Sequence, residues 1–179
     1  VAIRSPQEAQ KHGISTVYQE ITLCPNLTVA ENMFIGRTNG ATQNWKKMNA
    51  DTEEILKSLD IPAKATQQLS SCSIAVQQMV AIARAVDMEC KVLILDEPTV
   101  GLDPKQIIEI RNLIKKLGES HTIILSSHIL SEIQAVCDRV IIINNGNIAA
   151  NERTNNLSQA ISSDQKIALD FVGDLYGEV

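Results

Sequence analysis

The chain has 179 residues, of which 44% are hydrophobic and 21% charged, and its formal net charge is −5. This composition is too apolar for a disordered chain, and the length fits one compact domain with at most a short addition. The acidic balance argues against a nucleic-acid-binding protein, because such proteins usually carry a basic excess.

The first third of the chain predicts a short helix, a strand and a second short helix. Ser5 can cap a helix that begins at Pro6, because serine is a favoured N-cap and proline a favoured first helical residue. Gly13 is expected to end that helix, and residues 14–18, three of which are β-branched, predict a short strand. Thr28 is expected to cap the second helix.

Two longer helices are expected in the middle of the chain. The first follows a polar loop over residues 36–44 and is expected to begin at Asn49 or Asp51. Its apolar side chains would share one face: Ile55, Leu56 and Leu59. The second covers residues 74–86, which are rich in alanine, glutamine and methionine and follow Ser73 as N-cap.

Helices and strands alternate from residue 74 to about residue 143. The predicted strands are short apolar runs at 91–95, 122–126 and 139–143, and the helices between them cover 104–117 and 129–136. Because these strands are apolar on both faces, they predict a parallel sheet covered by helices. Asn145-Gly146 predicts a hairpin turn into residues 148–150. A capped helix over 156–161 and a strand over 166–171 are expected to follow.

Two adjacent carboxylates follow the apolar strand that ends near residue 95. The ends of such strands form the ligand edge of an open α/β sheet, so Asp96 and Glu97 are expected at that edge. One carboxylate can bind Mg²⁺, and its neighbour can orient or deprotonate a water molecule. The alternative is a solvated acidic turn after a buried strand.

Residues 92–99 resemble the Walker B strand and catalytic glutamate of the ATP-binding cassettes of ABC transporters. The resemblance implies an α/β fold, a truncated P-loop NTPase-like parallel sheet flanked by helices, with a helical signature subdomain. It also implies that Asp96 is associated with Mg²⁺ and that Glu97 is the general base for water attack on the γ-phosphate of ATP.

Three further segments resemble motifs of the same family. Residues 17–20 resemble the Q-loop, which implies that Gln19 touches the Mg²⁺ and the attacking water. Residues 125–128 resemble the switch strand, which implies that His128 reaches toward the γ-phosphate, although a lone histidine after a strand is otherwise more often structural. Residues Gly101, Leu102 and Asp103 resemble the D-loop, which implies that they contact the opposing cassette.

The signature motif is only partly matched. Ser73, Ile74 and Ala75 agree with the sugar-importer form of the motif, which implies contact with nucleotide bound to a second cassette. Ser73 could offer a hydroxyl and a helix N-terminus to a phosphate. Val76 replaces the signature glutamine and Cys72 the leucine before the serine, so an ordinary N-capped helix is the alternative.

The phosphate-binding Walker A loop has no counterpart in the chain. That loop needs the pattern Gly-x-x-x-x-Gly-Lys-Ser/Thr, because backbone N–H groups and a lysine cradle the phosphates. None of the eight glycines is followed by lysine. We expect the loop to lie upstream of Val1, and we expect the chain as printed to hydrolyse little or no ATP.

The resemblance differs between the two ends of the chain. Residues 5–99 look like a carbohydrate importer's cassette, whereas residues 98–179 are more similar to ABC-2 type export cassettes. Cargo and direction of transport stay open, as does the choice between a natural mosaic and an assembled chain. The predicted divisions are the strand and Q-loop part of the core (1–25), the helical signature subdomain (26–88), the Walker B, D-loop and H-loop part (89–152) and a C-terminal extension (153–179).

These features predict an ATP-binding and ATP-hydrolysing subunit of an ABC transporter, with ATP and Mg²⁺ as cofactors. The expected partners are a second cassette and membrane permease subunits, but no nucleic acid, and the expected location is peripheral at the cytoplasmic face of the membrane. No apolar run approaches the roughly 20 residues that span a bilayer, so a partner would supply the membrane connection. The alternatives are a non-hydrolysing interaction module derived from a cassette and a non-transport ABC ATPase.

Overall fold

The computed structural model describes residues 3–37, 44–88 and 90–156. The chain divides into two compact units, residues 1–128 and residues 129–179, which are described separately below. Most of the polar loop predicted at 36–44 lies outside the described residues. The helix predicted at 156–161 lies almost entirely outside them, and the strand predicted at 166–171 entirely so.

The first unit contains a parallel sheet of three strands in the order β1-β2-β3. The strands are β1 (Ile14–Val17), β2 (Val92–Asp96) and β3 (Thr122–Ser126). In the ladder Val17 lies beside Leu95, and Asp96 lies beside Ser126. The predicted parallel sheet is confirmed for these three segments, and their carboxyl ends meet at one edge of the sheet.

Helices α4 (Ile74–Asp87) and α5 (Pro104–Gly118) cover one face of this sheet. Helix α4 contacts β1, α5 contacts β3, and the two helices contact each other. Side chains of a strand alternate between faces, and Leu93 and Leu95 are both fully buried on the helix-covered face. Ile124, which projects from the opposite face, is 52% exposed. Burial against the two helices therefore fixes which face of each strand turns inward.

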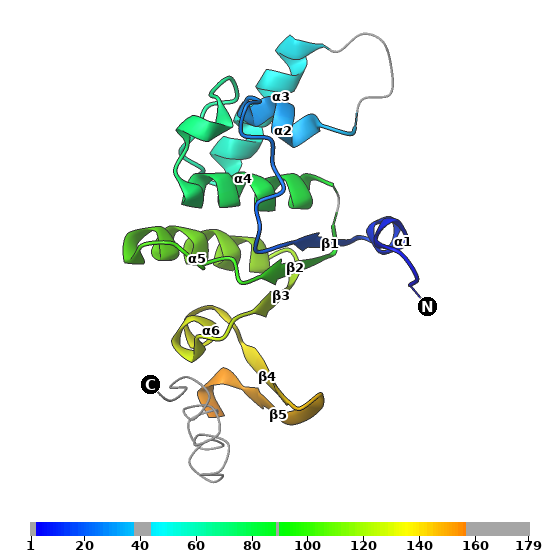
Figure 1. Ribbon diagram of the computed structural model, residues 1–179, viewed down its shortest axis with the longest axis vertical. Coiled ribbons are helices and arrows are strands. Elements are labelled where there is room, and N and C mark those ends of the chain that lie inside the picture. Colours follow the sequence, from blue (N-terminus) through cyan, green and yellow to red (C-terminus); the bar gives the residue numbers. More distant parts are fainter. Residues whose placement is uncertain (1–2, 38–43, 89, 157–179) are drawn as a thin grey trace, which may run out of the picture. The chain divides into compact units, whose positions relative to one another are not determined.

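A small helical layer packs on the other side of α4. It consists of α2 (Val29–Phe34), α3 (Trp45–Ser58) and the 3₁₀ turn η1 (Leu69–Ser71), and α2 and α3 contact both each other and α4. Figure 1 shows α4 lying between this layer and the sheet with α5. The predicted cap of α2 is confirmed: the Thr28 hydroxyl accepts the N–H of Glu31, and the Glu31 carboxylate accepts the N–H of Thr28.

Helix α3 begins earlier than the sequence predicted. The start expected at Asn49 or Asp51 is wrong, because Asn44 caps the helix by accepting the N–H of Lys47 at 3.1 Å. The buried side chains Met48 and Thr52 extend the inward face of the helix to this earlier turn. The expected face at the C-terminal end is present, with Leu56 only 1% exposed.

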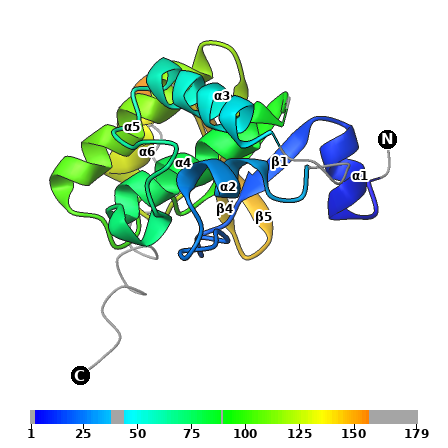
Figure 2. The same cartoon turned by 90° about the horizontal axis from the view of Figure 1, so that it is seen from above.

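Helix α1 (Pro6–Lys11) starts and stops as expected. Ser5 Oγ accepts the N–H of Glu8 at 3.2 Å, and Gly13 follows the helix with φ of +79°, a left-handed conformation that glycine adopts without steric cost. In both views α1 stands at the start of β1, apart from α2, α3 and α5 (Figures 1 and 2).

The second unit contains α6 (Leu130–Val136), β4 (Arg139–Asn144), β5 (Asn147–Arg153) and the 3₁₀ turn η2 (Thr154–Asn156). Strands β4 and β5 form an antiparallel pair joined by Asn145 and Gly146, whose φ angles of 47° and 76° suit a tight hairpin turn. The predicted hairpin is confirmed. The expectation that 139–143 joins the parallel sheet is wrong, because the two-residue turn brings β5 directly beside β4 in a separate sheet. The predicted divisions at residues 25, 88 and 152 stay predictions.

Candidate functional site

The carboxyl edge of the parallel sheet gathers Asp96, Glu97 and His128, three of the residues that the sequence predicted for a site. Strand β2 ends at Asp96 and is followed by Glu97, while β3 ends at Ser126 and is followed two residues later by His128. Because Asp96 and Ser126 are paired in the ladder, the residues after them are delivered to the same place.

Glu97 leaves the strand with an unusual backbone. Its φ is 45°, in the left-handed region that non-glycine residues enter only when neighbouring structure holds them there. Its N–H donates to the Ser126 carbonyl at 3.2 Å, and its own carbonyl accepts the N–H of Val100 at 3.3 Å. This turn directs the Glu97 side chain toward the chain that leaves β3.

The Glu97 side chain binds His128 through one oxygen. Glu97 Oε1 accepts the backbone N–H of His128 at 3.1 Å and lies 2.9 Å from His128 Nδ1. A carboxylate can only accept, so the hydrogen-bond network assigns the proton to Nδ1. The Glu97 side chain is 21% exposed and that of His128 60% exposed. Glu97 Oε2 is buried and accepts no hydrogen bond from any described residue.

Asp96 is bound by the end of the neighbouring strand. The Ser126 hydroxyl donates to Asp96 Oδ1 at 2.6 Å. Within the described residues no group of three or more histidine, cysteine or acidic side chains could hold a metal ion by themselves. A single carboxylate nevertheless fits Mg²⁺, which proteins commonly bind through one or two carboxylates together with substrate phosphates.

Gln19 lies at the same edge but outside this network. It is an exposed residue two positions beyond Val17, where β1 ends beside β2. None of the hydrogen bonds recorded for the described residues joins Gln19 to Asp96, Glu97 or His128. The structure therefore brings three of the four predicted residues into one cluster and places the fourth at the end of the adjoining strand.

The signature segment forms the start of α4. Ser73 Oγ accepts the N–H of Val76 at 3.3 Å and so caps the helix. Ser73 is exposed and Ile74 is 56% exposed, whereas Ala75 is fully buried. The side chain of Val76 is also buried, at 7% exposure, so the residue that replaces the signature glutamine packs into the core. Only the first two predicted contact residues offer side chains to a partner.

The segment that resembles a D-loop links the carboxylates to α5. Gly101 has φ of +76°, and Leu102 donates its N–H to the Thr99 carbonyl at 3.3 Å. Asp103 caps α5 by accepting the N–H groups of Lys105 and Gln106, both at 2.9 Å. Asp103 therefore has a structural role in the chain itself, whatever it contacts in a partner.

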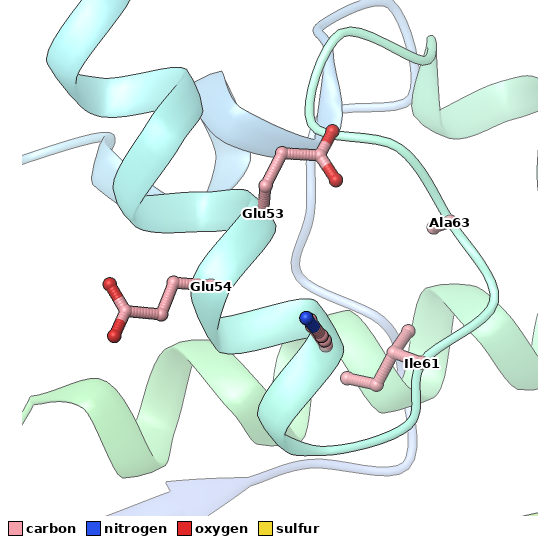
Figure 3. A pocket seen from close by; sticks show the side chains of 5 residues that line it. Glu53, Glu54, Ile61 and Ala63 are labelled. Atoms are coloured by element: carbon pink, nitrogen blue, oxygen red, sulfur yellow. The ribbon is translucent and has the colours of Figure 1, made fainter.

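Two pockets of the described structure lie away from the carboxylates. One, of about 550 Å³, lies between α3 and the loop after it; Glu53 uses one carboxylate oxygen to accept the N–H of Ala65 at 2.7 Å. Figure 3 shows the carboxylates of Glu53 and Glu54 pointing in different directions, so they do not form a pair that could share a proton or a cation. The other, of about 660 Å³, lies along α1, β1 and the last turns of α4. Neither pocket includes Asp96, Glu97 or His128.

Ser126 is the member of the cluster that sequence reasoning missed as a site residue. It stood within the switch-strand motif, but nothing in its own type distinguishes it from other serines at the end of a strand. The available signal was the register, because a parallel pairing of 92–96 with 122–126 places residue 126 beside Asp96.

Comparison with known proteins identifies the family. A protein-family model described as ABC transporter matches residues 3–100, more than half of the chain. The chain belongs to the ABC transporter family. Its fold, a parallel sheet flanked by helices, is that of the ATP-binding cassette.

Curated relatives of the chain include ATP-binding proteins of sugar transporters. The ribose import ATP-binding protein RbsA 2 of Rhizobium meliloti is 36% identical over 162 residues, which cover 88% of this chain and 31% of that protein. The galactofuranose transporter ATP-binding protein YtfR of Escherichia coli K12 is 36% identical over 162 residues, or 89% of this chain and 32% of YtfR. The chain spans about a third of the length of these relatives. Alignments of 162 residues extend beyond residue 100, so similarity to importers is not confined to the N-terminal half.

Solved cassettes share the fold. An ATP-binding cassette in its ADP conformation has a TM-score of 0.80 at 23% identity, covering 95% of this chain and 72% of that one. The protein cbiO1 of Clostridium perfringens, part of an ABC transporter complex, has a TM-score of 0.73 at 26% identity and covers 96% of this chain and 70% of its own. None of the described helices combines the length and the apolar character that crossing a membrane requires.

Proposed function

We propose that this chain is part of an ATP-binding and ATP-hydrolysing cassette that powers transport across a membrane. The observation that carries the proposal is the cluster of Asp96, Glu97 and His128 at the carboxyl edge of the sheet, in a chain of the ABC transporter family. The alternative interpretation, in which the two carboxylates form a solvated acidic turn, does not account for Glu97. Its side chain is only 21% exposed, and it forms two hydrogen bonds with His128.

Glu97 is the proposed general base. His128 holds Oε1 with two hydrogen bonds, which fixes the carboxylate. Oε2 receives no donor from the described chain but is buried, so proton transfer from an attacking water would require a rearrangement that exposes this oxygen. General base catalysis typically contributes about 10²–10⁴-fold to a rate. His128 would hold Glu97 in place and stabilise charge on the γ-phosphate.

Asp96 and Gln19 are the residues that would hold Mg²⁺ with ATP. Asp96 is the last residue of β2, Gln19 lies two residues beyond the end of the adjacent β1, and Asp96 keeps one oxygen bound to Ser126. When bound, Mg²⁺ neutralises phosphate charge during transfer. The chain would orient the two Mg²⁺-binding residues, because the ladder between β1 and β2 sets the spacing between the ends of these strands.

A second cassette and membrane permeases are the proposed partners. A structure similar to this chain, at 26% identity and a TM-score of 0.66, is described as a dimeric post-hydrolysis state of an ATP-binding cassette bound to ADP and phosphate. Ser73 and Ile74 in the signature segment, and the Gly101–Asp103 loop, would face the second cassette. The complex would lie at the cytoplasmic face of the membrane, with the chain attached peripherally through the permeases.

The proposed cargo is a small carbohydrate, and the proposed direction is import. The relatives reported above are named for ribose and galactofuranose, and a further relative, FruK of Bifidobacterium longum, is named for fructose and is 41% identical over 143 residues. These names support the class of cargo, because the aligned segments cover most of the chain.

The printed chain is expected to have little or no ATPase activity by itself, since it contains no Gly-Lys pair. The test therefore uses the chain preceded by the upstream cassette segment of YtfR. We expect this extended chain to hydrolyse ATP, and we expect Glu97→Gln to keep ATP binding while abolishing turnover. Glu119→Gln is the matched control, because Glu119 is exposed beyond the end of α5. Unchanged hydrolysis in Glu97→Gln would remove Glu97 from the role of base.

A non-hydrolysing interaction module is the second candidate, favoured by the burial of Val76 where the signature glutamine would stand. In that case the extended chain would bind its partner but show no hydrolysis, with or without Glu97. ATP hydrolysis by the extended chain that depends on Glu97 would exclude this candidate.

A further inference from the structure

One hydroxyl group lies between the two carboxylate residues of the candidate site. The Ser126 Oγ–H donates to Asp96 Oδ1 at 2.6 Å, and the same oxygen lies 3.2 Å from the N–H of Glu97. The Glu97 N–H also reaches the Ser126 carbonyl at 3.2 Å, so it is shared between two acceptors of one residue. Ser126 is thus in contact with both residues, although it is 30 positions from Asp96 in the chain.

The contact to Asp96 is of the charge-assisted kind. A hydroxyl that donates to a carboxylate typically lies about 2.5–2.7 Å from it, and such bonds are roughly twice as strong as neutral ones. The serine side chain has a single rotatable carbon–carbon bond, and its backbone is fixed by the ladder opposite Asp96. The hydroxyl can therefore select one orientation of the carboxylate.

The contact to Glu97 supports a strained backbone. A non-glycine residue in the left-handed region costs on the order of 1–3 kcal/mol and persists only where the surrounding structure holds it there. Glu97, with φ of 45°, has both acceptors for its N–H on Ser126. The direction in which the Glu97 side chain leaves the strand thus depends on the residue at position 126.

We propose that Ser126 is a positioning residue of the hydrolytic site, which orients the Asp96 carboxylate and holds the backbone of Glu97 so that its side chain meets His128. The inference rests on the proposed function for its catalytic consequence. The positioning role itself can be tested in the 179-residue chain. A threonine at position 126 would keep the hydroxyl and its contacts. An alanine would remove the donor to Asp96 and one of the two acceptors of the Glu97 N–H.

The first test uses the 179-residue chain with ¹³C-labelled aspartate and ¹⁵N-labelled backbone. We expect Ser126→Ala to shift the Asp96 carboxyl carbon and the Glu97 amide, and we expect Ser126→Thr to restore both resonances. Thr122→Ala is the control, because Thr122 is exposed at the other end of the same strand. If the Asp96 carboxyl resonance is the same in Ser126→Ala as in the unaltered chain, the positioning role is refuted.

The second test measures ATP hydrolysis in the extended chain. We expect Ser126→Ala to lower kcat by about tenfold, with KM for ATP changed less than about twofold, and Ser126→Thr to recover most of the rate. If Glu97→Gln abolishes turnover but Ser126→Ala does not lower it, the inference fails and the proposed function stands. If Glu97→Gln leaves turnover unchanged, the proposed function and the catalytic part of the inference fail together, and the resonances of the first test still decide whether Ser126 orients Asp96.

Discussion

The strongest single-residue prediction concerns Asn32, a polar side chain of α2 that is fully buried. Its Oδ1 accepts the N–H of Cys24 at 2.7 Å, and its Nδ2 donates to the carbonyls of Cys24 at 2.9 Å and Thr28 at 3.0 Å. These bonds hold the chain that leads from Gln19 to the helical layer against α2. Asn32→Ala removes all three.

The expected loss of unfolding free energy follows from the number of hydrogen bonds that the Asn32 side chain makes. A hydrogen bond within a folded protein contributes about 1 kcal/mol on average, and Asn32→Ala removes three such bonds at a side chain that is fully buried. The carbonyls of Cys24 and Thr28 keep other donors, the N–H groups of Leu27 and Asn32. The N–H of Cys24 is the group that loses its recorded partner. We expect Asn32→Ala to lower the free energy of unfolding by about 2–4 kcal/mol.

Urea unfolding can measure this loss through the single tryptophan. Trp45 begins α3, which packs against α2, so its fluorescence reports on the layer that Asn32 stabilises. With a dependence on urea of about 2 kcal/mol per molar, the midpoint should fall by about 1–2 M. Asn26→Ala is the control, because Asn26 is exposed in the same segment and should change the midpoint little.

Asn32→Asp separates hydrogen bonding from side-chain volume. Aspartate keeps the shape and the acceptor but turns an oxygen toward the carbonyls of Cys24 and Thr28, where the amide had donated. We expect it to destabilise the protein at least as much as alanine. If Asn32→Asp is as stable as the unaltered chain, or if Asn32→Ala and Asn26→Ala have equal midpoints, the hydrogen-bond account is refuted.

Two further predictions concern pH and backbone conformation. Hydrogen bonds from the backbone and side chain of Thr28 lower the pKa of Glu31 below its ordinary 4.5. The stability that this carboxylate contributes is therefore present above pH 4.5 and is lost as the pH falls through the lowered pKa. The unfolding free energy of Glu31→Gln should depend less on pH between pH 5 and 3 than that of the unaltered chain, and an unchanged dependence would contradict the assignment. Gly13 and Gly101 both have positive φ, so an alanine at either position costs about 1–2 kcal/mol. Gly13→Ala should lower the melting temperature more than Gly101→Ala, because only at Gly13 would the new methyl group meet a backbone nitrogen, that of Lys91 at 3.3 Å. Equal melting temperatures would show that this close approach is unimportant.

Local signals in the sequence predicted most of the elements. The N-caps Ser5, Thr28 and Ser73 each accept the expected backbone N–H, because a short side chain with an oxygen satisfies a helix start without help from the rest of the fold. The strand predicted at 122–126 agrees with β3 residue for residue. Apolar runs of this length between polar borders leave few alternatives once the helices on either side are fixed.

The misses arose where partners distant in sequence decide the outcome. Residues 139–143 form a strand, but hydrogen bonds to β5 place it in an antiparallel pair, and apolar content alone does not choose between partners. The start of α3 moved to Trp45 because buried Met48 and Thr52 lengthen its inward face, which depends on what packs against it. Ser126 became visible as part of the site only through its register with Asp96.

The contacts among Asp96, Glu97, Ser126 and His128 come from two neighbouring strands and the residues that follow them. The side-chain contacts that fix Asp96 and Glu97 come from Ser126 and His128, at the end of β3 and two residues beyond it, so these contacts are built within residues 92–128. Those bonds follow from the pairing of two neighbouring strands and require no phosphate-binding loop. The proposed hydrolytic residues are therefore held together by strand pairing within the chain itself, and under the proposed function the phosphate-binding loop would hold the substrate against them.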